Sequence, residues 1–219
     1  MVKAFLKIFI RKPKYVFLGE QFTDKAIVLS NHVASKGPLC NELYFPKQFC
    51  FWGTYEMNMD LREVYKYLSV TYFYNKKHWK LFWSRLFCLI AAPCAYLFYR
   101  GLNLIPTYTD HRLKKTFDIT HQVLDEGASV IIFPEDSHDG YHDHLAKFYP
   151  GFVTLAYSRL RKGEDLPIYL CYLNKANNTY VVDKPIFASE LFSSGKTKED
   201  IAEQFRKRCN ELGEMSKNY

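Results

Sequence analysis

A histidine that follows an apolar strand is the first candidate for chemistry in this sequence. Residues 26–30 read AIVLS and run directly into Asn31 and His32. Such a run predicts a buried strand, and open α/β sheets build their sites at the carboxyl ends of strands. A neutral imidazole there can take a proton from an alcohol. His32 is therefore the candidate catalytic base, although a histidine after a strand can also be a structural hydrogen-bonding group.

A second polar segment follows another apolar run. Residues 129–133 form this run, and Pro134 closes it. The loop that comes next begins with Glu135, Asp136, Ser137 and His138. Because the carboxyl ends of parallel strands meet at one edge of a sheet, we expect this loop to lie beside His32.

The elements that must position these groups alternate along the chain, as in an α/β domain. The predicted strands cover residues 26–30, 48–52, 103–106, 129–133 and 167–173. The turn-rich residues 174–178 and the run 179–182 predict an antiparallel hairpin strand, and residues 196–215 predict a closing charged helix. We therefore expect one α/β domain over residues 1–219, with a mostly parallel central sheet flanked by helices.

Two apolar segments lie outside this pattern. Residues 65–100 are crowded with aromatic residues, but the run from Leu86 is interrupted by Pro93 and bounded by Arg85 and Arg100. It is therefore shorter than the about 20 apolar residues that a membrane span needs. We expect an apolar, membrane-facing helical hairpin; the alternative is a helix pair buried in the protein or in a dimer contact. Residues 1–19 predict a short amphipathic interfacial anchor rather than a signal peptide.

The composition favours an anionic lipid surface as partner. Lys and Arg outnumber Asp and Glu by 30 to 23, and aromatic residues make up 17% of the chain. Because the basic residues stand beside Phe, Trp, Leu and Ile, we expect a phospholipid membrane and no nucleic acid. The six cysteines contain no C-x-x-C pair, which indicates a reducing compartment. The expected location is the cytoplasmic face of a membrane, with peripheral or monotopic attachment.

Taken in order, the polar blocks resemble those of the glycerolipid acyltransferase family, whose type members convert lysophosphatidate to phosphatidate. The resemblance covers roughly residues 20 to 190. It rests on Asn31-His32, on Gly101 with Ile105-Pro106, on Phe133-Pro134-Glu135, on the helix start at Gly151 and on Leu166-Pro167-Ile168.

The resemblance implies an O-acyltransferase of phospholipid biosynthesis. Its co-substrate would be an acyl-CoA or acyl carrier protein thioester, and its acceptor a lysophospholipid or a related glycerol hydroxyl. His32 would remove a proton from the hydroxyl, which attacks the thioester carbonyl without a covalent enzyme intermediate, a cofactor or a metal. A base of this kind contributes about 10² to 10⁴ in rate.

The chain departs from the family at the carboxylate that accompanies the histidine. The family's Asp, five positions after the histidine, falls at Gly37. Replacing the analogous Asp of serine proteases costs about 10⁴ in rate, roughly 5 kcal/mol. The family's Gly after Phe-Pro-Glu is Asp136 here, so we expect Asp136 to supply this carboxylate as a second catalytic residue, unless it only caps a turn. Glu42 is a further candidate, although helical spacing can turn it away from His32.

The groups that would hold the acceptor also differ from the family pattern. The phosphate-binding Arg of the third block is His138 here, which leaves Arg112, Lys36 and Lys147 as cations for a phosphate. Neutral donors on Asn31 and His138 could instead hold a different headgroup. The substrate-binding candidates are Asn31, Lys36, Arg112, Glu135, Ser137 and His138.

Two other classes of function stay open at this point. The density of His and Asp over residues 138–144 could bind a divalent metal in a hydrolase, although the helical H-x-x-x-H spacing is missing and nothing fixes a second shell. The chain could also be a catalytically impaired lipid-binding or scaffold homologue that kept the fold after losing its Asp.

Overall fold

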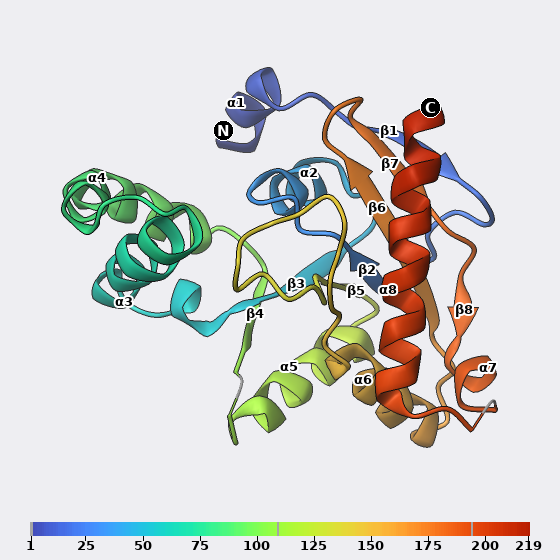
Figure 1. Ribbon diagram of the computed structural model, residues 1–219. Coiled ribbons are helices and arrows are strands. Elements are labelled where there is room, and N and C mark those ends of the chain that lie inside the picture. Colours follow the sequence, from blue (N-terminus) through green and yellow to red (C-terminus); the bar gives the residue numbers. More distant parts are fainter. Residues whose placement is uncertain (1, 109, 194) are drawn as a thin grey trace. The chain divides into compact units, whose positions relative to one another are not determined.

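The computed structural model describes residues 2–108, 110–193 and 195–219 (Figure 1). The chain divides into two compact units. The first unit comprises Met1–Phe49, Val123–Asp136 and Tyr141–Tyr219, and the second comprises Cys50–Gln122 and Ser137–Gly140. The second unit contains the apolar segment over residues 65–100.

The first unit is built on a mostly parallel mixed sheet. Its strands are β1 (Lys14–Phe17), β2 (Ile27–Ser30), β5 (Ser129–Ile132), β6 (Pro167–Asn174), β7 (Thr179–Val182) and β8 (Ile186–Phe187). They lie in the order β1-β7-β6-β2-β5, with β8 paired to β6. The pairs β1–β7, β2–β6 and β2–β5 are parallel, whereas β6 pairs antiparallel with β7 and β8.

The central strands are buried because their sequences are apolar on both faces. Every residue of β2, β5 and β7 is buried, as are seven of the eight residues of β6. Near-continuous Val, Ile and Leu runs of this kind are typical of parallel strands covered on both sides. The predicted strands and the hairpin of β6 with β7 are confirmed in this unit.

Helices cover this sheet. They are α1 (Val2–Phe9), α2 (Lys36–Tyr44), α6 (Gly151–Arg161), α7 (Ala188–Ser193) and α8 (Lys198–Met215). Figure 1 shows α8, in red, running along β6, against which it packs. It begins at a capping box, in which the Thr197 hydroxyl and the Asp200 carboxylate bond each other's backbone N–H groups.

The predicted interfacial anchor is wrong in its length. Lys14–Phe17, which lies inside the expected segment 1–19, forms strand β1 and pairs in parallel with β7. The helical part ends at Phe9, before Pro13. Four residues of KYVF are too short to stand out from an amphipathic pattern, and pairing with β7 decides their conformation.

The second unit combines two parallel strands with a group of helices. Strand β3 (Phe49–Thr54) pairs with β4 (Leu104–Thr107). Between them lie η1 (Tyr55–Asn58), α3 (Leu61–Lys66), the π-helix η2 (Tyr67–Lys76) and α4 (Leu81–Tyr99). Helix α5 (Leu113–Asp125) follows β4. Helices α3 and η2 pack on α4 through Val64, Leu68, Cys88 and Ala92.

Helix α4 extends beyond the apolar run that begins at Leu86. It begins at Leu81 rather than at Leu86, spans 19 residues and contains Pro93. An 18-residue window of it has a mean hydropathy of 1.6 and is only 17% buried, so α4 is long and apolar enough to cross a membrane. The prediction that this segment is too short for a span is therefore wrong as regards length. Core helices of soluble proteins can have the same length and composition, so these two properties alone do not show that α4 crosses a membrane.

Candidate functional site

His32 lies where β2 leaves the sheet, between two parallel neighbours. Leu29 of β2 is level with Ile132 of β5 and with Leu170 of β6. His32 and Glu135 each stand three residues beyond this level on adjacent strands. The two polar segments therefore emerge at the same edge of the sheet, as the sequence predicted.

Two aromatic rings hold the imidazole of His32. The Phe133 ring meets it edge-on with centroids 4.8 Å apart, and the Tyr141 ring stacks on it at 4.6 Å with an angle of 18° between the planes. The Nδ1 atom is shielded from solvent. Tyr141 was missed by the sequence reasoning, which considered its loop only for metal-binding His and Asp. No spacing rule in the sequence indicates this contact.

Asn31 fixes the end of β2 to β6. Its side-chain Nδ2 donates to the carbonyl of Leu173 at 3.1 Å, and the Leu173 N–H donates to its Oδ1 at 2.7 Å. Asn31 is 2% exposed. Because both ends of the amide bond the main chain, Asn31 positions the end of β2, and its role in substrate binding stays a prediction.

A buried chain of hydroxyls supports the same strand end. The Asn41 amide donates to the Tyr180 hydroxyl at 3.3 Å, and this hydroxyl donates to Ser30 Oγ at 2.6 Å. Ser30 Oγ in turn donates to the Asn31 carbonyl at 3.1 Å. Burial raises the pKa of Tyr180 well above its usual value, so the phenol stays a neutral donor. The backbone that carries His32 is thus fixed on both sides.

Gly37 has no room for the family's carboxylate. A Cβ atom built on Gly37 would lie 2.2 Å from the carbonyl oxygen of His32 and 2.9 Å from its carbonyl carbon. The Gly37 N–H donates to that same oxygen at 3.2 Å. Val33 and Ala34 form the tight turn between them with φ of 48° and 52°, a left-handed conformation that β-branched residues rarely adopt. The backbone after His32 therefore leaves no space for a side chain at position 37.

Three other carboxylates of the first unit, Glu42, Asp136 and Glu135, are candidates to accompany His32. Glu42 pairs with Lys3 of α1 at 2.5 Å, and its side chain is 5% exposed. The Tyr149 hydroxyl bonds Asp136. Burial, and to a smaller extent this hydrogen bond, raise the pKa of the Tyr149 hydroxyl. Glu135 is buried; burial, and then the charge of Glu135, raise the pKa of the Cys209 thiol in α8. Glu135 therefore lies close to the interior as well as to the sheet edge.

The candidate cations are divided between the two units. In the first unit, Lys36 Nζ donates to the carbonyl of Lys175 at 3.0 Å. In the second, Arg112 lies beside the stacked rings of Tyr55 and Tyr108, 4.8 and 4.4 Å from their centroids. Its Nε and Nη2 bond the Asp110 carboxylate at 3.0 and 2.7 Å, which lowers the pKa of Asp110 to about 2.

Ser137 and His138 belong to the second unit. Lys76 Nζ donates to Ser137 Oγ at 2.8 Å, and His138 is exposed. In the first unit the base of this loop is closed by a bridge between Glu135 and Phe148 and by the Tyr149 N–H, which donates to the carbonyl of Pro134 at 2.7 Å. Asp136 is thereby fixed at the base of the loop.

The histidines and aspartates of residues 138–144 show no metal-binding arrangement in the described parts of the chain. No group of three or more His, Cys, Asp or Glu side chains gathers there to hold an ion. His144 contacts Asn210 at 3.3 Å, and the carbonyl of Asp143 accepts from the Tyr172 hydroxyl at 2.7 Å. These contacts tie the loop to α8 and β6.

The chemistry open to this arrangement is proton transfer at an oriented imidazole, beside the strand that delivers the buried Glu135. Comparison with models of known protein families gave no match, and neither did comparison with curated proteins.

Proposed function

We propose that the protein is a membrane-associated O-acyltransferase of the glycerolipid type, which moves a fatty acyl group from a thioester to a lysophospholipid or related glycerol hydroxyl. The observation that carries the proposal is His32, held at the end of β2 between Phe133 and Tyr141 and beside the strand that delivers Glu135. An imidazole at this place is suited to general base catalysis.

The proposed reaction uses the Nε2 atom of His32, because Nδ1 is shielded from solvent. Nε2 takes the proton from the acceptor hydroxyl while the oxygen attacks the thioester carbonyl. The tetrahedral intermediate then collapses, the C–S bond breaks, and the leaving thiolate receives the proton from the imidazolium. Acyl-CoA and acyl carrier protein both supply such a thioester, and no enzyme atom becomes acylated.

The imidazolium formed in this reaction needs stabilisation that Gly37 does not provide. The face of Tyr141 offers part of it, since a cation over an aromatic ring gains about 0.5–2 kcal/mol. Asp136 stays the proposed carboxylate, fixed at the base of its loop and bonded by Tyr149. Glu42 is a weaker proposal, because Lys3 already neutralises its charge.

Membrane attachment is supported by apolar side chains that face solvent. In α4, Phe82, Ile90 and Leu97 are 69%, 77% and 72% exposed, and Ile8 and Phe9 of α1 are 75% and 71% exposed. Exposed apolar surface of this extent on a helix marks a lipid or protein contact. Lys77, Lys80 and Arg85 flank the start of α4, as expected where cations meet lipid headgroups. All six cysteines are free thiols, which agrees with a cytoplasmic face.

The acceptor would be held by groups from the proposed set of substrate-binding residues. The candidates are Asn31, Lys36 and Glu135 in the first unit, and Arg112, Ser137 and His138 in the second. Arg112 is held rigidly by Tyr55 and Tyr108, but Asp110 already engages its guanidinium.

The test is an assay of the purified full chain with radiolabelled acyl-CoA or acyl carrier protein and a panel of lysophospholipids. The proposal predicts a labelled diacyl product whose formation is insensitive to EDTA. Product that disappears with EDTA would indicate a metal-dependent enzyme instead.

A non-catalytic lipid-binding protein is the second candidate function. The favouring observation is Gly37, whose contact with His32 leaves no space for the usual carboxylate. This candidate predicts vesicle binding without product for any thioester in the panel.

A further inference from the structure

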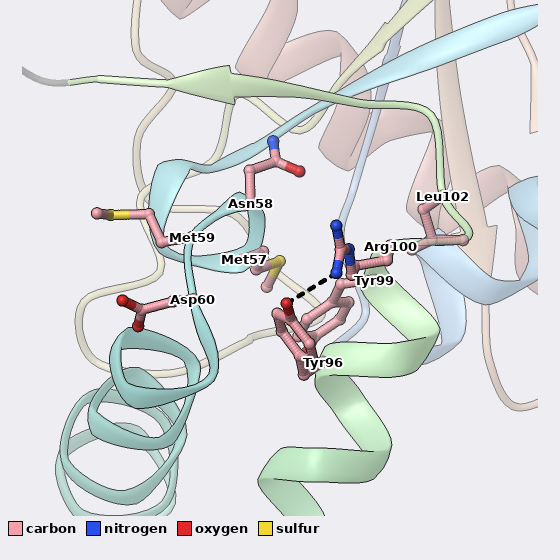
Figure 2. A pocket seen from close by; sticks show the side chains of 8 residues that line it. All are labelled: Met57, Asn58, Met59, Asp60, Tyr96, Tyr99, Arg100 and Leu102. Carbon is pink, nitrogen blue, oxygen red and sulfur yellow. Dashed lines mark hydrogen bonds between the residues drawn. The ribbon is translucent and has the colours of Figure 1, made fainter.

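A cavity of about 470 Å³ lies within the second unit, between η1, the start of α3 and the end of α4 (Figure 2). Asn58 and Asp60 line it from one side, and Tyr96, Tyr99 and Arg100 from the other. Its volume falls in the range of small-ligand sites. None of the residues discussed for acyl transfer lines this cavity, so it is a separate candidate site.

The cavity presents one positive and one negative group. Arg100 Nη1 donates to the Tyr96 hydroxyl at 2.9 Å, and its guanidinium lies 5.3 Å from the centroid of that ring. Figure 2 shows this contact as a dashed line beside the ring of Tyr99. Within the described parts of the chain, no acidic side chain forms an ion pair with Arg100. The guanidinium is thus oriented by Tyr96 while its charge stays available for an anion.

Asp60 supplies the negative group and is fixed in place. It is the N-cap of α3, and its Oδ1 accepts the N–H of Glu63 at 3.0 Å. Among the described residues no hydrogen bond to Oδ2 is found, so this oxygen can accept from a bound ammonium group. Tyrosine rings in the same cavity add a further favourable surface for a cation.

The position of the cavity relates it to lipid. Arg100 directly follows α4, and Leu97, one turn earlier, is 72% exposed. Met59 and Leu61 beside Asp60 are 44% and 41% exposed. Polar groups and tyrosines at the end of an apolar helix are typical of the level of lipid headgroups.

We propose that this cavity binds the headgroup of a zwitterionic phospholipid. Arg100, oriented by Tyr96, contacts the phosphate, and Asp60 with the Tyr99 ring receives the ammonium group. An anionic headgroup would leave Asp60 facing negative charge, so the pair of opposite charges selects phosphocholine or phosphoethanolamine over phosphoglycerol. The inference rests on the membrane attachment in the proposed function, but not on acyl transfer.

The test measures binding of monomeric dihexanoyl phospholipids to the full chain by isothermal titration. We expect phosphatidylcholine or phosphatidylethanolamine to bind and phosphatidylglycerol to bind more weakly. Arg100→Gln should weaken binding of the zwitterionic lipid about tenfold, because it removes a charge-assisted hydrogen bond to the phosphate. Asp60→Asn keeps an N-capping side chain. It should weaken binding of the zwitterionic lipid and strengthen binding of phosphatidylglycerol.

Arg62→Gln is the matched control, since Arg62 is an exposed cation of α3 that does not line the cavity. No binding by the unmodified chain, equal binding of phosphatidylglycerol, or an equal loss in Arg62→Gln would overturn the inference. Circular dichroism checks that each variant folds. If the cavity variants bind lipid as expected while no acyl product forms, the headgroup site is supported and the proposed acyl transfer is wrong. If acyl product forms while the cavity variants bind lipid like the unmodified chain, acyl transfer is supported and the headgroup site is wrong.

Discussion

The imidazole of His32 is oriented by aromatic rings instead of by a carboxylate at the family's position. Tyr141 stacks on it and Phe133 meets its edge. Ring contacts restrict the rotation of the imidazole, and in the proposed reaction the π-face of Tyr141 stabilises the imidazolium that forms. Orientation and charge stabilisation, which one Asp supplies in the family, are therefore divided among several residues in this proposal.

Tyr141→Leu is expected to lower kcat about tenfold, because it removes a ring contact of about 0.5–1.5 kcal/mol and the cation–π contribution. Tyr141→Phe keeps the stacked ring and should retain most of the activity. The measurement is steady-state kcat for both variants. Equal loss in the two variants would show that the phenol hydroxyl, and not the ring, is what matters.

Asp136→Asn tests the compensating carboxylate. If Asp136 stabilises the imidazolium, kcat should fall by about 10² to 10⁴, with KM little changed, because the interaction forms in the transition state. Asp139→Asn is the control, since Asp139 is an exposed acid three residues further along the loop. An Asp136→Asn enzyme with unchanged turnover would remove Asp136 from the mechanism.

Restoring the family's residue at Gly37 should destabilise the protein. Gly37→Asp would bring its Cβ within 2.2 Å of the His32 carbonyl oxygen, so the loop must shift. We expect a loss of about 1–3 kcal/mol in the free energy of unfolding, as for other overpacked sites, measured by urea denaturation. Ser35→Asp is the control, because Ser35 is the exposed N-cap of α2 and tolerates an acid. A Gly37→Asp protein as stable as the unmodified chain would contradict this account of the turn.

At the scale of elements, the helices and strands differ in how well the sequence predicts them. Buried strands such as β2 and β5 are recognisable because their apolar runs reflect burial on both faces. Strand β1 is not recognisable in the sequence, because its pairing with β7 decides its conformation. The first turn of α4 is not recognisable either, because the helix continues through Trp83 and Arg85. Likewise, the sequence predicts that the acid-rich loop lies at the sheet edge, because the loop follows a buried strand. It does not predict the stacking of Tyr141 on His32, which depends on the path of that loop.

Helix α4 carries the membrane proposal at this scale. Ile90→Ser should weaken binding to liposomes about tenfold or more, since burying an isoleucine stabilises by roughly 1.5–3 kcal/mol and Ile90 is 77% exposed. Phe187→Ser, at an exposed aromatic residue of β8, is the control and should bind as before. Co-sedimentation with vesicles measures both. Unchanged sedimentation of Ile90→Ser would show that α4 does not contact lipid.

At the scale of the whole molecule, the chain joins a sheet unit that holds His32 to a second unit that holds α4 and the cavity. The division could not be derived from the sequence, because the second unit takes up residues from two separate stretches of chain. In the proposal, the formal charge of +7 favours attachment to an anionic membrane surface. In the proposal, the first unit holds the catalytic imidazole, and α1 of the first unit and α4 of the second both contact lipid.

The most direct test of the central claim is the rate of acyl transfer by His32→Ala compared with His142→Ala, which alters an exposed histidine. Both proteins are assayed with the same labelled thioester and lysophospholipid, after circular dichroism has shown that they fold. If His32 is the general base, its variant should lose about 10² to 10⁴ in kcat while His142→Ala keeps the full rate. Product formed at the same rate by both variants would contradict the account.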